Sequence, residues 1–209
     1  MSETVDAAAD APDTADATEP PAQKHVGAYI EMLISSVLGL IASLVLSIEA
    51  ITLAENPAAV LSCDLSSKIS CGAVSESWQA HLFGWPNSFL GLIAEPVVIT
   101  VALAALGGVR FPRWFMLTAQ GFYTIGLVFA WWLFSQSYFV IGKLCPWCLL
   151  ITVTTTLVFM SLTRVNILDG AFGQGVKRAL SPALAMWIDV WISVLIIAAL
   201  VASVIFKYI

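Results

Sequence analysis

Five apolar segments, each long enough to cross a lipid bilayer, dominate this sequence. They cover approximately residues 29–53, 87–109, 114–137, 144–163 and 185–206. A helix needs about 20 apolar residues to cross roughly 30 Å of hydrocarbon. Hydrophobic residues make up 59% of the chain and charged residues only 11%, whereas soluble domains carry about 25% charged residues. The sequence therefore predicts an all-α integral membrane protein with five transmembrane helices.

The N-terminal stretch differs in composition from the rest of the chain. Residues 1–22 hold six acidic residues and no basic one. Such a segment buries too little apolar surface to fold, and it lacks the positively charged start of a signal peptide. We expect residues 1–25 to form a disordered acidic cytoplasmic tail and residues 26–209 to form one five-helix transmembrane domain. No basic patch follows, which argues against a nucleic acid partner.

Basic residues set the expected orientation, because cytoplasmic loops carry an excess of Lys and Arg. With the N-terminus in the cytoplasm, six basic residues lie inside and three lie outside. The inner residues are Lys24, Arg110, Arg113, Arg164, Lys177 and Arg178, and the outer ones are Lys68, Lys143 and Lys207. We therefore expect a multi-pass protein of the cell inner (plasma) membrane whose loop of residues 54–86 faces outward. All four cysteines then lie on the side where disulfides form and persist.

The most informative motif is Cys145-Pro146-Trp147-Cys148, at the head of the fourth apolar segment. Two cysteines three residues apart in a first helical turn lie on nearly one face, close enough to bridge. The helix N-terminus favours a thiolate, and Pro146 suits a first turn, where no N–H partner is needed. The motif predicts a redox-active pair, with two buried structural cysteines as the alternative. The remaining Cys and His residues lack ligand-like spacing, so no metal site is expected.

Cys63 and Cys71 form a second pair in the outer loop. A loop pair of this kind is commonly a static disulfide staple. A redox-active pair on the same membrane face suggests another role, because thiol–disulfide exchange needs a second pair within reach. A mobile loop carrying one pair beside a rigid helix carrying the other would relay electrons. The residues alone leave both interpretations open.

Two further features are an aromatic-rich stretch between the cysteine pairs and a few carboxyl groups in the apolar segments. Residues 75–87 are rich in aromatic side chains, which favours a position at the membrane interface, either as an aromatic belt or as a lid over a pocket beside Cys148. Carboxyl groups near the ends of the apolar segments, such as Glu49, are expected to reach the interface. A carboxyl group within the hydrocarbon is costly and often functional, so Glu95 is the candidate for a proton or packing role.

Together, these features resemble the vitamin K epoxide reductase family, especially its bacterial members. The family pattern has a loop cysteine pair, a Ser or Thr six residues after the second loop cysteine, and a CxxC motif at the start of the fourth helix. Ser77 and the Cys145/Cys148 pair occupy these positions here. The resemblance covers about residues 30–165. It implies a four-helix bundle around a quinone site, to which this chain adds a fifth transmembrane helix.

The resemblance also implies roles for the cysteines. Cys148 would lie nearest the quinone and Cys145 would exchange with the loop through Cys63. Cys71 would then meet an external thiol partner.

Other residues are assigned to the quinone on the same basis. Ser77 would hydrogen-bond a quinone oxygen, Asn87 would bind a quinone carbonyl, and the neighbouring Trp78 would join them in substrate binding. The animal enzymes carry a tyrosine four residues after the second CxxC cysteine, where this chain has Thr152. This difference makes epoxide reduction a poorer expectation than quinone reduction.

The implied function is that of a quinone-dependent membrane thiol oxidase that supports disulfide bond formation. It would reoxidise a separate extracytoplasmic thioredoxin-fold (DsbA-like) protein and pass the electrons to menaquinone or ubiquinone in the bilayer. One alternative is a DsbB-type oxidase of different fold, although oxidases of that type carry their cysteine pairs in two outer loops. The other is a non-catalytic membrane scaffold with two structural disulfides.

Overall fold

A computed structural model describes residues 25–208 of the chain. Its helices are α1 (Val26–Glu55), α2 (Cys71–Ser75), the 3₁₀ helix η3 (Trp78–His81), α3 (Ser88–Leu106), α4 (Arg113–Ser135), the π-helical η4 (Gln136–Ile141), α5 (Pro146–Leu168), α6 (Gln174–Ala185) and α7 (Ile188–Tyr208). The acidic tail predicted for residues 1–25 lies outside the described residues, except for its last position.

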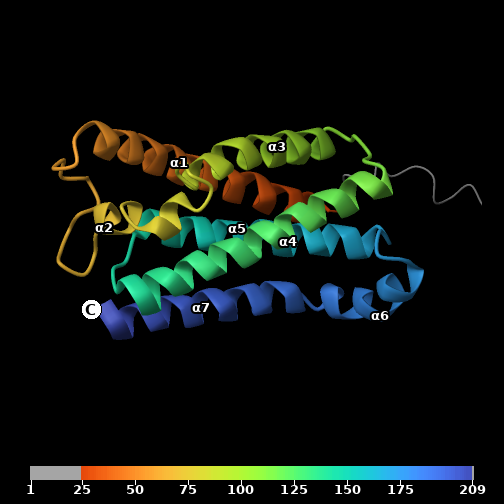
Figure 1. Ribbon diagram of the computed structural model, residues 1–209. Helices are drawn as coiled ribbons and strands as arrows, with labels where there is room; N and C mark the ends of the chain where they lie inside the picture. The colour runs from red at the N-terminus through yellow and green to blue at the C-terminus, as the bar shows by residue number, and fades with distance from the viewer. Residues whose placement is uncertain (1–24, 209) are drawn as a thin grey trace, which may run out of the picture.

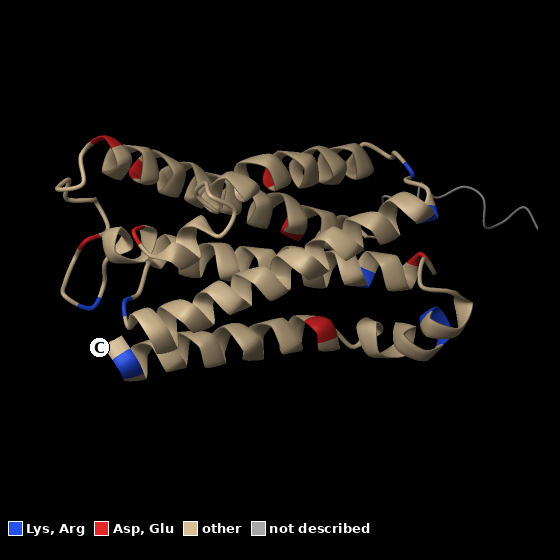
Figure 2. Cartoon of the chain, viewed as in Figure 1, with Lys and Arg blue, Asp and Glu red and all other residues tan. Residues whose placement is uncertain are grey.

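Five helices of the described chain are long and apolar enough to cross a membrane, namely α1, α3, α4 together with η4, α5 and α7. The Lys and Arg residues gather mostly toward the two ends of these helices, and the middle carries mainly a few acidic residues (Figure 2). The prediction of an all-α, multi-pass membrane protein with five spans is therefore confirmed.

The first four of these spans form a bundle in which α1 packs against both α3 and α5, and α4 packs against α5. The backbones of α3 and α4 rarely approach each other closely, so the contacts between these two helices are made mainly by side chains. α7 runs beside this bundle, and its C-terminal end lies at the same end of the molecule as α2 (Figure 1). The bundle thus has one open side between α3 and α4.

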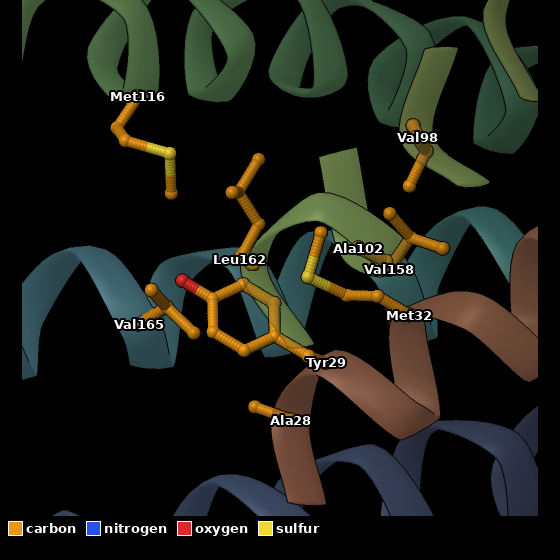
Figure 3. Packing of buried hydrophobic residues seen from close by; sticks show 10 residues of the cluster. Ala28, Tyr29, Met32, Val98, Ala102, Met116, Val158, Leu162 and Val165 are labelled. Atoms are coloured by element: carbon orange, nitrogen blue, oxygen red, sulfur yellow. The ribbon is translucent and has the colours of Figure 1, made fainter. Parts of the chain in front are cut away.

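Apolar side chains fill the half of the bundle that lies away from the cysteines. Met32 of α1 is 1% exposed and Leu162 of α5 is 2% exposed. Figure 3 shows Tyr29 and Met32 of α1 beside Leu162 and Val165, with Met116 approaching from α4. Lipid tails are as apolar as these side chains, so close van der Waals packing holds the helices together more than the hydrophobic effect does.

Small residues allow α1 and α3 to approach each other closely. A Cβ atom at Gly91 would clash with the Ser43 hydroxyl, and one at Gly39 would lie 2.9 Å from a carboxyl oxygen of Glu95. Nearer the C-terminal end of α1, Ser47 Oγ donates a hydrogen bond to Ser88 Oγ at 2.9 Å. This seam fixes the first turn of α3 against α1.

The segment from Arg164 to Arg178, which lies between the fourth and fifth predicted spans, is mostly helical. α5 continues to Leu168, and α6 begins only six residues later. Arg164 donates hydrogen bonds to both carboxyl oxygens of Asp189 at 2.7 Å and lies 4.8 Å from the centre of the Trp187 ring. This bidentate pair compensates the charge of Asp189 at the start of α7 and ties α7 to α5.

Candidate redox site

The start of α5 positions the CxxC motif as the sequence predicted. Cys145 is the N-cap residue, and the backbone N–H of Cys148 donates to its Sγ atom at 3.3 Å. Pro146 takes the first helical position. Both cysteines are free thiols, with Cys145 buried and Cys148 partly buried. The first turn of α5 thus directs a backbone N–H group at the Cys145 sulfur.

The two loop cysteines are joined by a disulfide. The Cα atoms of Cys63 and Cys71 lie 5.6 Å apart, and the two residues are 5% and 0% exposed. Cys71 opens the short helix α2, whose N-cap residue Ser70 accepts a hydrogen bond from the backbone of Ala73. The disulfide is therefore part of a folded loop packed into the protein.

Backbone pairing docks this loop onto the segment that precedes α5. Ile69 and Leu144 form a parallel β-bridge, in which the N–H of Ser70 donates to the Leu144 carbonyl at 3.0 Å. As a result, Cys71 Sγ lies 3.3 Å from Cys145 Sγ. A free thiol this close to a disulfide sulfur is within reach of thiol–disulfide exchange.

This contact favours a different order of exchange from the one that the family resemblance implied. Cys145 was expected to exchange through Cys63, leaving Cys71 for an external partner. Instead Cys71 faces Cys145, because the β-bridge brings the residue after Ser70 onto the start of α5. Cys63 lies on the far side of the disulfide, where its Sγ atom is 3.4 and 3.5 Å from the carboxyl oxygens of Glu49.

Asp64 holds the loop in this shape. One carboxyl oxygen accepts hydrogen bonds from Ser70 Oγ at 2.7 Å and from the Gly72 N–H at 3.1 Å. The other accepts from the Leu61 N–H at 3.2 Å. Desolvation acts to raise the pKa of Asp64, but these hydrogen bonds outweigh it, with the one from Ser70 the strongest, and hold the pKa below its usual value.

The pH dependence of the loop follows from this lowered pKa. A folded-state pKa below the unfolded value stabilises the loop at neutral pH, and that stability is lost as the pH falls from about 4 through the lowered pKa. We expect Asp64→Asn to speed reduction of the loop disulfide by a water-soluble phosphine about fivefold at pH 7, the factor for roughly 1 kcal/mol of hydrogen bonding. The ratio of variant to wild-type rate should be smaller at pH 3, nearer the lowered pKa, than at pH 7.

The exposed Glu76, replaced by Gln, serves as the matched control for this measurement. Its reduction rate should equal that of the wild type at both pH values. An Asp64→Asn rate equal to wild type at pH 7 would show that the carboxylate does not hold the loop.

A cavity of about 600 Å³ lies directly beside the CxxC motif, and both Cys145 and Cys148 line it. Its walls are mainly apolar side chains of α3, α4 and α5. The volume falls within the range of about 300–1,000 Å³ that is typical of small-molecule sites.

The structure brings two of the three predicted ligand-binding residues into this cavity. Ser77 and Asn87 both line it. Trp78 does not: its side chain is 65% exposed and packs edge-on against Trp132, with ring centres 6.2 Å apart. Trp78 therefore lies outside the wall of this cavity, whereas its neighbour Ser77 forms part of it.

The polar atoms of the cavity favour a ligand that donates hydrogen bonds. Asn87 Nδ2 donates to the Gln79 carbonyl at 2.6 Å, whereas Asn87 Oδ1 is buried without a partner among the described residues. Ser77 Oγ donates to the Val74 carbonyl at 2.6 Å, so only its lone pairs remain for a ligand. Buried acceptors without partners are rare in proteins. Both residues therefore have acceptor capacity left.

Three further polar residues that were considered from the sequence lie at this site. Glu49, which was expected to reach the membrane interface, is 6% exposed and lies against Cys63. Glu95, the candidate for a proton or packing role, lines the cavity and accepts a hydrogen bond from Tyr123 at 3.3 Å. Thr152, at the position of the animal tyrosine, donates to the Cys148 carbonyl at 3.0 Å.

A membrane helical bundle in which a loop disulfide contacts a helix-capping CxxC defines a membrane thiol–disulfide oxidoreductase. The sequence model of the vitamin K epoxide reductase family matches residues 30–163, which is more than half of the chain and includes both cysteine pairs. The protein therefore belongs to the vitamin K epoxide reductase family, whose oxidoreductases are in general linked to quinones. No curated protein sequence matches the chain.

Proposed function

We propose that this protein oxidises the dithiol of a separate thioredoxin-fold protein and passes the electrons to a membrane quinone, thereby supporting disulfide bond formation. The observation that carries this proposal is the position of the CxxC pair. Cys145 Sγ lies 3.3 Å from Cys71 Sγ of the loop disulfide, and Cys145 and Cys148 both line the apolar cavity. One thiol pair thus contacts both a protein-side electron donor and a site for a lipid-soluble acceptor.

Electrons enter through the loop and reach the CxxC pair by disulfide exchange. The partner's dithiol reduces the Cys63–Cys71 bond and becomes a disulfide itself. The Cys71 thiolate then attacks Cys145 of an oxidised Cys145–Cys148 pair, and Cys148 leaves as a thiolate. Cys63 next attacks Cys71, which restores the loop disulfide and releases Cys145. The CxxC pair is now reduced, and the loop can accept the next pair of electrons.

Electrons leave at the cavity. Oxidation of the Cys145–Cys148 dithiol to a disulfide releases two electrons and two protons. A quinone can accept both. The apolar walls fit a lipid-soluble ring. Asn87 Oδ1 and the Ser77 oxygen would hold its reduced form, because a hydroxyl on the ring donates the hydrogen bonds that these acceptors lack.

The open side of the bundle supports entry of this acceptor from the bilayer. Ile93 of α3 and Ile125 of α4 both line the cavity, yet they are 66% and 69% exposed. Since the backbones of α3 and α4 rarely approach each other closely, we infer that the cavity opens toward lipid between them. Menaquinone and ubiquinone, with their apolar tails, both suit such an opening.

The proposed orientation puts the N-terminus in the cytoplasm and all four cysteines on the outer side of the inner (plasma) membrane. The loop of residues 56–70 and the turn before α5 lie at the end that the basic residues assign to the outside. A thioredoxin-fold partner would dock there, at the loop.

Titration of the fully reduced protein with quinone tests this function. We expect anaerobic addition of quinone to remove two thiols for each quinone reduced, as a two-electron couple requires. The loss of quinone is measured by absorbance and the thiols by a colorimetric count. Persistence of all thiols in the presence of excess quinone would instead identify a structural scaffold.

A further inference from the structure

Glu49 of α1 contacts the loop disulfide and has no part in the exchange steps described so far. Its two carboxyl oxygens lie 3.5 and 3.4 Å from Cys63 Sγ. The hydroxyl of Ser62 donates a hydrogen bond to one of them at 2.9 Å. The residue is 6% exposed, so this carboxyl group is held in a fixed place against a reacting sulfur.

The surroundings of Glu49 do not account for a carboxyl group. Its neighbours at the disulfide include the buried apolar residues Leu46 and Leu61, and no salt bridge to Glu49 occurs within residues 25–208. A buried carboxyl without a cation is costly. A neutral amide would accept the Ser62 hydrogen bond equally well. What a carboxyl adds is the ability to take up and release a proton.

We propose that Glu49 is the proton acceptor and donor for Cys63 in the loop exchange, an inference that rests on the proposed function. When Cys63 resolves the Cys71–Cys145 disulfide, its thiol proton passes to the Glu49 carboxylate. The Cys63 thiolate attacks Cys71 Sγ, the Cys71–Cys145 bond breaks, and Cys145 leaves as a thiolate. In the reverse direction Cys63 is the leaving group and takes its proton back from Glu49. One disulfide replaces another, so no external oxidant is needed.

The arrangement of the three sulfurs supports this role. Cys71 contacts Cys145 on one side and is bonded to Cys63 on the other. At one end of this row, the Cys148 N–H at the start of α5 donates a hydrogen bond to Cys145 Sγ. At the other end, Cys63 begins no helix and has Glu49 instead. Each terminal sulfur therefore has its own means of carrying or losing charge, as reversible exchange requires.

A protein that lacks quinone and carries Cys148→Ala isolates this three-sulfur exchange. In this background we expect Glu49→Gln to slow interconversion of the Cys63–Cys71 and Cys71–Cys145 disulfides about 100-fold at pH 7, the size of a typical general-base effect. The rates are measured after a pH jump by acid quenching, alkylation and mass spectrometry of the free cysteine. Glu55→Gln, an exposed change on the same helix, should leave the rate unchanged.

The pH profile separates proton transfer from a structural role. Near pH 9 a thiol ionises without help, since its ordinary pKa is about 8.5, so the deficit of Glu49→Gln should shrink to a few-fold there. Asp64 of the loop and Cys148 of α5 are the other titratable groups that act on Glu49. Asp64 stays ionised across this range and Cys148 is absent from the background, so neither produces the change.

Two results would overturn the inference: a Glu49→Gln rate within twofold of the background at pH 7, or a deficit that is the same at pH 7 and pH 9. The second would mark Glu49 as a packing residue. Because quinone takes no part in this assay, failure of the wild-type protein to reduce quinone would contradict the proposed function alone.

Discussion

Replacement of Cys148 by alanine is expected to abolish quinone reduction by a small dithiol, lowering the rate by about 10³-fold or more. Without Cys148, the Cys145 thiol has no partner with which to form the disulfide that releases two electrons at the cavity. The measurement is anaerobic and follows quinone absorbance with excess small dithiol as the donor. Partner protein is omitted, so that only the CxxC pair and the cavity are tested.

Cys71→Ala is the matched control for this result. It also removes one buried cysteine next to Cys145, but it leaves the CxxC pair intact, so the small-dithiol rate should stay within a few-fold of wild type. A Cys148→Ala rate near that of the wild type would contradict the assignment of the CxxC pair as the site of electron exit.

Local signals made the helical part of the site predictable. The N-cap position of Cys145 and the first-turn position of Pro146 depend only on neighbours in sequence. The apolar run after them predicted a span of residues 144–163, and α5 covers Pro146–Leu168. The spans were found for the same reason, because length and hydrophobicity are properties of each segment alone.

Long-range contacts explain what the sequence could not predict. The choice of Cys71 over Cys63 as the neighbour of Cys145 depends on the β-bridge between Ile69 and Leu144, two residues 75 positions apart. Neither residue carries a pattern that marks such a bridge. The burial of Glu49 likewise requires the loop that carries Cys63 to fold back over the C-terminal end of α1.

The amphipathic helix α6 was missed for a different reason. Its residues include Gly175, Lys177 and Arg178, so the stretch has the polarity of a turn and lacks the apolar length that identifies a span. The pairing of Arg164 with Asp189, which positions the connection to α7, is also a contact between distant parts of the chain.

The two loop cysteines should behave differently when each is replaced, and this difference tests the proposed order of exchange. With Cys71→Ala, electron flow from a thioredoxin-fold protein to quinone should fall at least about 100-fold, because no other loop sulfur contacts Cys145. No disulfide between the loop and α5 should accumulate. Cys63→Ala blocks the same flow at a later step: Cys71 still attacks Cys145, but no thiol resolves the product, so a Cys71–Cys145 disulfide should accumulate.

Non-reducing peptide mass spectrometry of the two variants during turnover distinguishes this order from its reverse. If Cys63 were the sulfur that exchanges with α5, Cys71→Ala would trap a Cys63–Cys145 disulfide, and Cys63→Ala would trap none. The structure favours the first pattern, because the β-bridge at Leu144 holds Cys71 against Cys145 while Cys63 faces Glu49. The reverse pattern would require the loop to leave this bridge in each catalytic cycle, and removing the bridge should then speed electron flow rather than slow it.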